Sequence, residues 1–394
     1  MRKISLIITL CVAYFIINFN LSFIYPMLPA IKKEFGGTNF QISILISAFS
    51  IPAFFCNFFY GPVIDKHGRK RFIILGAIGT AFTFLCAVFS INLYMLIGMR
   101  LLSGLFIPMI GASIFPCIID NFPPEERVKY IGWVQAMASF AQIVALPMGI
   151  VTGELISWFY PFIFISFLAL ITLVGTVCYI PCNLSNIETR TITLSGMLHK
   201  YVVLCNHAEV RNKLFSYAFI SIYIYSIFGM YPFWLTLHHS QQPENLAFFF
   251  AVTAISGLLG SVSAHMLKIN EENHGNIKLG ILFIFNSITL ISLPLFPFSI
   301  IIQCIIFSVF SFIRAVLSPI IFASIFKGVS STDRSTLNGI MNACFQLCSA
   351  VGGAISTYSF SYSPDFFLNA TVAILFSAIG ILFLRFSRAA KTSP

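Results

Sequence analysis

A short polar segment, Gly61-Pro62-Val63-Ile64-Asp65-Lys66-His67-Gly68-Arg69-Lys70-Arg71, joins the second and third long apolar runs of this chain. Gly61 has no side chain, so the helix before the segment can approach a neighbouring helix closely, and Gly68 permits a tight turn. The Asp65 carboxylate can accept from a helix N-terminus or pair with an arginine, while the Arg69 guanidinium offers a planar fork to a carboxylate. The segment therefore predicts a charged junction at the ends of closely packed helices.

The composition of the 394 residues is that of a membrane protein. Hydrophobic residues make up 58% and charged residues 9%, with a mean hydropathy of +0.91, which leaves too little polar surface for a water-soluble globule of this size. The apolar runs are continuous rather than alternating, and a helix needs about 20 such residues to cross a bilayer. Because lipid-exposed backbone must satisfy its own hydrogen bonds, we expect membrane-spanning helices.

Twelve such runs are predicted as membrane spans. They cover residues 4–30, 40–64, 72–91, 93–119, 128–156, 158–182, 213–239, 245–267, 277–296, 298–326, 335–361 and 364–386. The first run follows Arg2 and Lys3 and could instead be a signal peptide, but it is long and no small-x-small cleavage site closes it. We expect it to be the first span.

Basic residues are distributed unequally between the two sides of the membrane. If both ends of the chain lie inside, 19 of the 23 lysine and arginine residues fall on the inner side, against Lys32 and Lys33 outside. The positive-inside rule therefore predicts cytoplasmic termini. The formal net charge of +10 follows from this topology and from contact with anionic lipid, so it predicts no nucleic-acid partner.

The sequence lacks motifs for catalysis, metal binding and nucleotide binding. The ten cysteines form no C-x-x-C pair and no His/Cys cluster at metal-ligand spacing. Neither a G-x-x-x-x-G-K-S/T loop nor a Ser/His/Asp constellation occurs. We therefore expect no metal, no cofactor and no enzymatic activity.

The sequence also contains two related halves. Residues 272–278 repeat residues 65–71 at an offset of 207, as a decayed second copy in the loop after the eighth span. Residues 319–326 match residues 108–115 at an offset of 211. Matches in the same order at nearly constant offset indicate two six-helix halves related in parallel.

The offset of 207 also maps Arg127 onto Arg334. We predict an N-terminal bundle at residues 1–182, a cytoplasmic linker at 183–212 and a C-terminal bundle at 213–394. Two similar bundles can rock about a site near the bilayer midplane and expose it to one side at a time.

The segment at residues 61–71 fits the signature G-x-x-x-D-x-x-G-R-K/R-x-K/R, and the chain resembles the major facilitator superfamily, which carries this signature in the same cytoplasmic loop. The resemblance implies an all-α membrane fold of 12 transmembrane helices in two pseudo-symmetric six-helix bundles. It also implies a conformational latch that holds the halves in the outward-facing state, formed by Gly61, Asp65, Gly68, Arg69 and Asp120. Asp120, at the inner end of span four, is the candidate partner of Arg69. The alternative for the basic residues Lys66, Lys70 and Arg71 is that they only set topology and bind lipid head groups.

Two further motifs resemble the 12-helix drug:proton antiporter branch. Arg100-Leu101-Leu102-Ser103-Gly104 resembles the R-x-x-x-G core of the fourth-helix motif, and residues 22–29 look like the first span of bicyclomycin/chloramphenicol-resistance transporters. The chain departs from that branch at Ser22, where an acidic residue is expected. In span five, Leu146-Pro147-Met148-Gly149-Ile150-Val151 keeps the proline of G-P-x-x-G-G but not its glycine pattern. Proton exchange would then depend on other groups, or the protein would be a uniporter or symporter.

Two arginines lie within predicted spans, where a charged side chain is costly and is a candidate for function. Arg314 lies deep in span ten, whereas Arg100 lies nearer the outer surface and could instead snorkel to it. No acidic residue lies near the centre of any span, so a buried guanidinium favours an anionic substrate or moiety. Coupling groups at helix ends are Glu154, Asp120 or a histidine.

Polar and aromatic residues complete the predicted substrate site, because the superfamily lines its cavity with spans one, four, seven and ten. Beside the two arginines they are Asn18, Asn20, Tyr25, Tyr223, Tyr225, Trp234 and Gln303. Aromatic residues near helix ends also form interfacial belts, and the asparagines could bond a neighbouring helix instead.

These observations predict a secondary active transporter of the bacterial inner membrane. The first hypothesis is efflux of drugs or metabolites, as in multidrug resistance, in exchange for protons. The alternative is transport of an anionic metabolite or siderophore-like carboxylate, with Arg314 as its anchor. We expect a small-molecule substrate, protons as the coupling ion, contact with membrane lipids and a monomeric protein.

Overall fold

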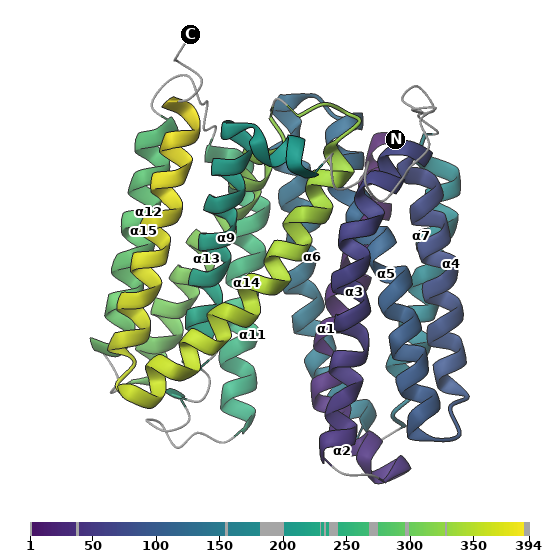
Figure 1. Ribbon diagram of the computed structural model, residues 1–394. Coiled ribbons are helices and arrows are strands. Elements are labelled where there is room, and N and C mark those ends of the chain that lie inside the picture. Colours follow the sequence, from purple (N-terminus) through teal and green to yellow (C-terminus); the bar gives the residue numbers. More distant parts are fainter. Residues whose placement is uncertain are drawn as a thin grey trace. The chain divides into compact units, whose positions relative to one another are not determined.

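The computed structural model describes residues 2–36, 39–153, 157–181, 201–228, 230–231, 234–235, 243–267, 275–295, 299–327 and 329–389. Within these residues the chain forms helices joined by turns, without a strand (Figure 1).

The helices from the first half of the sequence are α1 (Arg2–Ser22), α2 (Ile24–Phe35), α3 (Asn39–His67), α4 (Arg69–Val88), α5 (Leu93–Asn121), α6 (Pro124–Val151) and α7 (Tyr160–Tyr179). Those from the second half are α9 (Ala208–Phe228), α11 (Pro243–Ser263), η2 (Ala264–Leu267), α12 (Gly275–Leu295), α13 (Ile300–Ile325), α14 (Arg334–Tyr362) and α15 (Phe367–Ala389).

Each predicted span coincides with a helix to within a few residues over its described part, with one correction. The first span, predicted as a single run at residues 4–30, is interrupted at Phe23, where α1 ends and α2 begins. Pro26 has no N–H to donate to the Ser22 carbonyl four residues earlier, so one hydrogen bond of the helical ladder is missing at this break.

Eight of the described helices are long and apolar enough to cross a membrane. They lie at Lys3–Ser22, Arg69–Val88, Leu93–Asn121, Pro124–Gly149, Tyr160–Tyr179, Phe248–Leu267, Ile300–Ile325 and Arg334–Tyr362. α12 and α15 contain shorter apolar stretches, Ile281–Leu295 and Phe367–Phe383. The chain is therefore a multi-pass membrane protein.

Contacts divide the chain into two units. Unit 1 consists of Met1–Met197 and Gly328–Asn342, and unit 2 consists of Leu198–Lys327 and Ala343–Pro394. The first turns of α14 thus belong to unit 1, although this helix comes from the second half of the sequence. The predicted limits of the bundles at residues 182 and 183 lie outside the described residues and stay a prediction.

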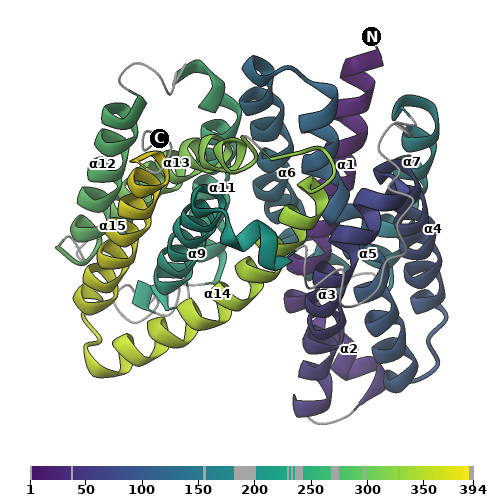
Figure 2. The same ribbon diagram turned by 45° about the horizontal axis from the view of Figure 1, so that its top comes forward.

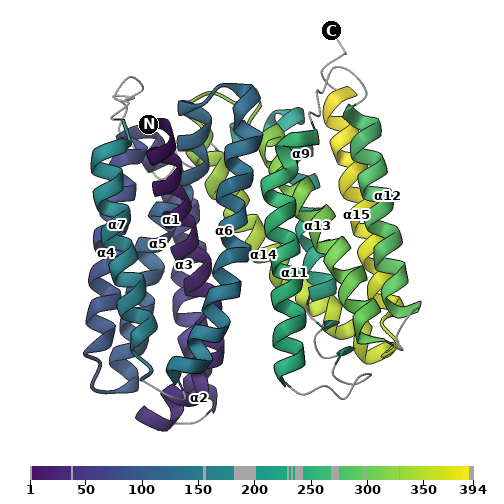
Figure 3. The same ribbon diagram turned by 180° about the vertical axis from the view of Figure 1, so that it is seen from behind.

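In unit 1, α5 packs against α3 and α4, α4 packs against α7, and α1 packs against α6 and α7. Figure 3 shows α7 beside α4 and α1. Aromatic side chains fill the space between these helices. Phe162 of α7 meets Phe23 edge to face at 5.2 Å between ring centroids and lies 5.7 Å from Phe84 of α4. All three rings are buried.

In unit 2, α15 packs against α9, α11 packs against α13, and α12 packs against α13 and α15. Figure 2 shows α12 beside α15. These pairs repeat α7 with α1, α3 with α5, and α4 with α5 and α7, so the internal repeat of the sequence recurs as the same helix pairing. The core of unit 2 is also aromatic: Tyr231 stacks on Phe307 at 4.4 Å and contacts Trp234 and Phe366. The predicted all-α membrane fold is confirmed.

Phe162→Ala tests the core of unit 1. We expect it to lower the free energy of unfolding by about 3–5 kcal/mol, because the neighbouring rings cannot fill the space that the lost side chain leaves. Phe167 on the same helix is 60% exposed, and Phe167→Ala is the matched control with an expected change below about 1 kcal/mol. Denaturant unfolding in detergent micelles measures both, and equal destabilisation would contradict this packing.

Candidate conformational latch and buried arginines

The turn between α3 and α4 is made by a single glycine. Gly68 has φ +90°, in the region that favours glycine, and its N–H donates to the Ile64 carbonyl at 2.9 Å. Arg69 begins the next helix directly after this turn. Asp65 and Arg69 therefore lie four residues apart and face each other across the turn, with 3.5 Å between Oδ1 and Nη2.

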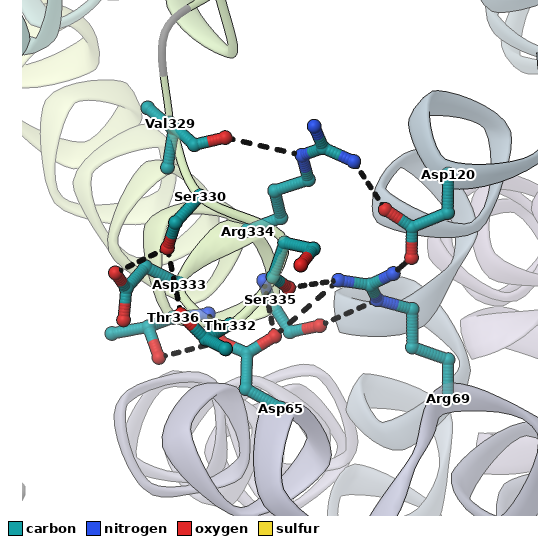
Figure 4. A network of polar contacts seen from close by, with 11 residues as sticks. Asp65, Arg69, Asp120, Val329, Ser330, Thr332, Asp333, Arg334, Ser335 and Thr336 are labelled. Atoms are coloured by element: carbon teal, nitrogen blue, oxygen red, sulfur yellow. Dashed lines mark hydrogen bonds and ion pairs between the residues drawn. The ribbon is translucent and has the colours of Figure 1, made fainter. Parts of the chain in front are cut away.

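The Asp65 carboxylate binds the N-terminus of α14. Its Oδ1 accepts from the Ser335 N–H at 2.9 Å, and its Oδ2 accepts from the Thr336 N–H at 2.7 Å and from the Thr336 hydroxyl at 2.8 Å (Figure 4). These backbone groups belong to the first turn of a helix, where N–H groups lack a partner within the helix and carry partial positive charge. The Asp65 side chain is 1% exposed, so it acts as a buried anionic cap on a helix far away in the sequence.

Arg69 joins the same helix to α5. Its Nη2 donates to the Ser331 carbonyl at 2.8 Å, its Nε donates to the Ser335 hydroxyl at 3.1 Å, and its guanidinium forms an ion pair with Asp120. Arg334, the first residue of α14, forms a second ion pair with Asp120. Figure 4 shows the Asp120 carboxylate between the two arginines. All of these residues belong to unit 1.

Gly61 allows the close approach of α3 and α14 that this network needs. A Cβ at this position would lie 2.7 Å from the Thr336 Cα and 2.9 Å from the Ser335 carbonyl oxygen, both of them backbone atoms. The structure therefore brings together four of the residues assigned to the latch, Gly61, Asp65, Arg69 and Asp120, and places the fifth, Gly68, in the turn beside them.

Sequence reasoning did not name the residues on the α14 side of the network. Ser335 and Thr336 carry no charge, and Arg334 counted only as a basic residue on the inner side. A signal was present in the repeat that maps Arg127 onto Arg334. The Arg127 Nε donates to the Phe122 carbonyl at 3.1 Å, and the Arg334 Nε donates to the Val329 carbonyl at 3.3 Å, at the same offset of 207.

Arg100 is held inside unit 1 and does not reach the outer surface. It is 2% exposed, its Nη1 donates to the Asn20 carboxamide of α1, and its Nε donates to the Leu45 carbonyl of α3 at 3.3 Å. Its guanidinium lies over the rings of Phe23 and Phe49, at 5.9 and 5.3 Å from their centroids. Arg100 thus connects three helices, and snorkelling does not describe its position.

Arg314 lies in α13, within electrostatic range of the phenols of Tyr223 and Tyr225 on α9. Tyr223 is buried and accepts a hydrogen bond from the Asn286 carboxamide of α12. Tyr225 meets the Phe345 ring edge to face at 5.5 Å. Three of the predicted site residues therefore lie on two helices of unit 2 that contact each other, α9 and α13.

The remaining candidates are less closely grouped. Asn18 donates to the Tyr14 carbonyl of its own helix at 2.9 Å. Gln303 accepts from the Tyr231 hydroxyl at 2.9 Å and donates to the Leu293 carbonyl at 2.7 Å, while Trp234 lies in the aromatic core of unit 2. Gln303 and Trp234 are fully buried here. The Tyr25 side chain and the residues Glu154, His238 and His239 lie outside the described part.

Asp65→Ala tests the cap on α14. We expect amide hydrogen exchange at Ser335 and Thr336 to become at least about tenfold faster, because hydrogen bonds to a charged acceptor contribute about 1.5–3 kcal/mol each. Lys66→Ala in the same loop is the matched control and should leave the exchange unchanged. Mass spectrometry of peptides covering residues 329–342 measures this, and equal rates in both variants would exclude the cap.

The amino-acid sequence matches a known protein family. The family model described as Major Facilitator Superfamily matches residues 10–353. The uncharacterized MFS-type transporter YceJ of Bacillus subtilis (strain 168) is 22% identical over 389 residues, which cover 96% of this chain and 95% of that protein. The class B tetracycline resistance protein of Escherichia coli is 30% identical over 173 residues, 43% of this chain and 41% of that protein.

Among solved structures, the human organic anion transporter MFSD10 (TETRAN) superposes with a TM-score of 0.76 at 14% identity, over 98% of this chain and 99% of that one. At this identity the likeness shows the fold alone. The match of the family model over most of the chain shows more. This chain belongs to the Major Facilitator Superfamily and is a membrane transporter, not an enzyme.

Proposed function

We propose that this transporter exports amphipathic drugs or metabolites across the cell inner membrane by alternating access, in exchange for protons. The observation that carries the proposal is the anchoring of the α14 N-terminus by Asp65, Arg69 and Asp120. The identity of 30% to a tetracycline resistance protein over 173 residues supports the efflux direction.

The network suits a contact that breaks and forms again. Three of its charged side chains keep some exposure to water, at 12% for Arg69, 13% for Asp120 and 17% for Arg334, whereas Asp65 is buried. When the pairs separate, water solvates the freed charges, and this offsets much of the lost attraction. We infer that the latch closes the cytoplasmic side when formed, and that its release costs little enough for turnover.

Proton coupling in this chain must use groups outside the centre of the membrane. All 13 acidic residues lie in loops or near helix ends, so no carboxylate at mid-span is available to exchange a proton with substrate. Asp120 is the described candidate, because a proton on its carboxyl would weaken both of its ion pairs at once.

Everted membrane vesicles with an acidic interior test the export hypothesis. Ethidium and tetracycline should accumulate inside, because one-to-one exchange against about one pH unit sustains about a tenfold concentration ratio. Nigericin should abolish the accumulation, and vesicles without the protein are the control. Transport that ignores the imposed gradient, together with unchanged drug susceptibility on deletion of the gene, would refute export coupled to protons.

A second candidate function is transport of an organic anion. The observation that favours it is Arg314, a permanently charged guanidinium within a membrane-spanning helix, next to the hydrogen-bonding phenols of Tyr223 and Tyr225. A carboxylate on the substrate would meet a positive charge and two hydroxyl donors in one layer of unit 2. Carboxylates bind guanidinium groups in a bidentate manner, which fixes orientation as well as charge.

Arg314→Gln tests this candidate. Transport of fluorescein, an anionic probe, should fall at least about tenfold, since a charge-assisted hydrogen bond contributes about 1.5–3 kcal/mol. Transport of ethidium, a cation, should not fall, and Arg314→Lys should restore part of the fluorescein transport. Arg211→Gln, at an exposed arginine of α9, is the matched control. If fluorescein transport survives Arg314→Gln unchanged, Arg314 is not the anchor of an anion.

A further inference from the structure

The contact of α14 with unit 1 continues beyond the charged network. Gly339 lies against α3: a Cβ there would be 2.4 Å from the Asn57 carbonyl oxygen and 3.6 Å from the Gly61 Cα. Asn338 lies against α5, where its Nδ2 donates to the Gly111 carbonyl at 3.0 Å. Both residues belong to unit 1 together with their partners.

This second contact is buried from solvent. Asn338 is fully buried, and its neighbours in sequence Leu337, Ile340 and Met341 are buried as well. At 1.5 Å per residue, Asn338 lies about 3–4.5 Å further along α14 than Ser335 and Thr336. The side chains of the charged network are 12–17% exposed at Arg69, Asp120 and Arg334. Two layers of different chemistry therefore hold the same helix.

The two layers should respond differently to salt concentration. The ion pairs of Arg69, Asp120 and Arg334 keep some exposure, so salt weakens them, by less than it weakens fully exposed pairs; the Debye length falls to about 3 Å at 1 M salt. A backbone contact through glycine has no charge to screen, and a buried amide hydrogen bond has no water to replace it. The glycine contact also has no interlocking side chains, so the helices can separate and meet again without side-chain rearrangement.

We propose that Asn338 and Gly339 are positioning residues of the transport cycle: they hold α14 against α3 and α5. They keep this contact intact when the charged network is weakened. The proposal rests on the alternating-access mechanism for its functional meaning. Gly339 sets the distance, because any side chain there would hold the α3 backbone away. Asn338 sets the register, because its amide reaches one carbonyl of α5.

Hydrogen exchange of the Ser335 and Thr336 amides, measured in 0.1 M and in 1 M NaCl, tests the two layers. We expect the wild-type amides to stay protected in 1 M NaCl. In Gly339→Ala we expect exchange at least about tenfold faster than wild type, with the larger increase in 1 M NaCl, where screening weakens the ion pairs of the first layer. Gly353→Ala on the same helix is the matched control, because a Cβ at Gly353 meets nothing within 4 Å.

Asn338→Leu gives a second and independent measurement, because it keeps the side-chain volume and removes the hydrogen bond to Gly111. We expect the same salt-dependent loss of protection, and a changed KM for ethidium or fluorescein if the conformational equilibrium shifts. Asn338→Gln should restore protection in part. The thermal unfolding midpoint and the amide hydrogen-exchange rates in α7 report general damage to the fold. Both should be the same as in the wild type.

Three results would overturn the proposal. The first is that the wild-type Ser335 and Thr336 amides lose protection in 1 M NaCl. The second is that these amides exchange in Gly339→Ala as they do in Gly353→Ala. The third is that the variants lose protection in α7 as much as at Ser335 and Thr336. Because hydrogen exchange needs no substrate, these results are independent of the proposed export. A wild-type protein that transports neither probe, yet shows the expected exchange, would refute the function and leave the two-layer seat in place.

Discussion

The low dielectric of the membrane interior governs this structure, because a polar group there must find its partner within the protein. Three described polar side chains at mid-span, Arg100, Tyr223 and Gln303, follow this constraint. Arg100 is held by the Asn20 carboxamide, the Leu45 carbonyl and two aromatic rings. Tyr223 is held by Asn286, and Gln303 by Tyr231 and the Leu293 carbonyl. Each of these contacts joins different helices, so satisfying the polar groups also fixes how the helices pack.

The same constraint moves the acidic residues to the ends of the spans, where water can reach them. There a carboxylate can meet either an arginine or the N-terminus of a helix, and Asp65 meets both. The charges of this network then attract α14 to α3 and α5, while the glycines allow the backbones to approach. Electrostatic attraction and close backbone packing thus both stabilise the contact of α14 with α3 and α5.

The sequence predicts this half of the site well because the residues of the loop are close together in the chain. Gly61, Asp65, Gly68 and Arg69 lie within nine positions, and Asp120 is the acidic residue at the inner end of a predicted span. Ser335 and Thr336 could not be predicted in the same way. They contribute backbone N–H groups, which every residue except proline carries, so only the fold shows which ones meet Asp65. The break of the first span at Phe23 was missed for a different reason: apolar composition is continuous there, and the missing hydrogen bond of Pro26 leaves no trace in hydropathy.

The substrate candidates show a related limit. Asn20 was predicted to contact substrate or, alternatively, a neighbouring helix, and in the structure it binds Arg100 across helices. Residue type alone could not decide between these two uses, since a carboxamide serves equally well in both. Trp234 and Gln303 are buried in the core of unit 2, and a role for them at a binding site requires that core to open. Arg314 with Tyr223 and Tyr225 is the better supported group, because three predicted residues from two helices lie together.

The internal repeat explains both what is shared between the halves and what is not. Arg127 and Arg334 make the same hydrogen bond to a carbonyl five residues earlier, so the backbone geometry at the start of α6 and α14 is retained. The position that matches Asp120 is Lys327 at the offset of 207, and Ser331, which carries no charge, at the offset of 211. A lysine there cannot form the ion pair with Arg127 that Asp120 forms with Arg334, because two cations repel. The repeat therefore preserves the helix ends, whereas neither position that matches Asp120 carries an acidic side chain.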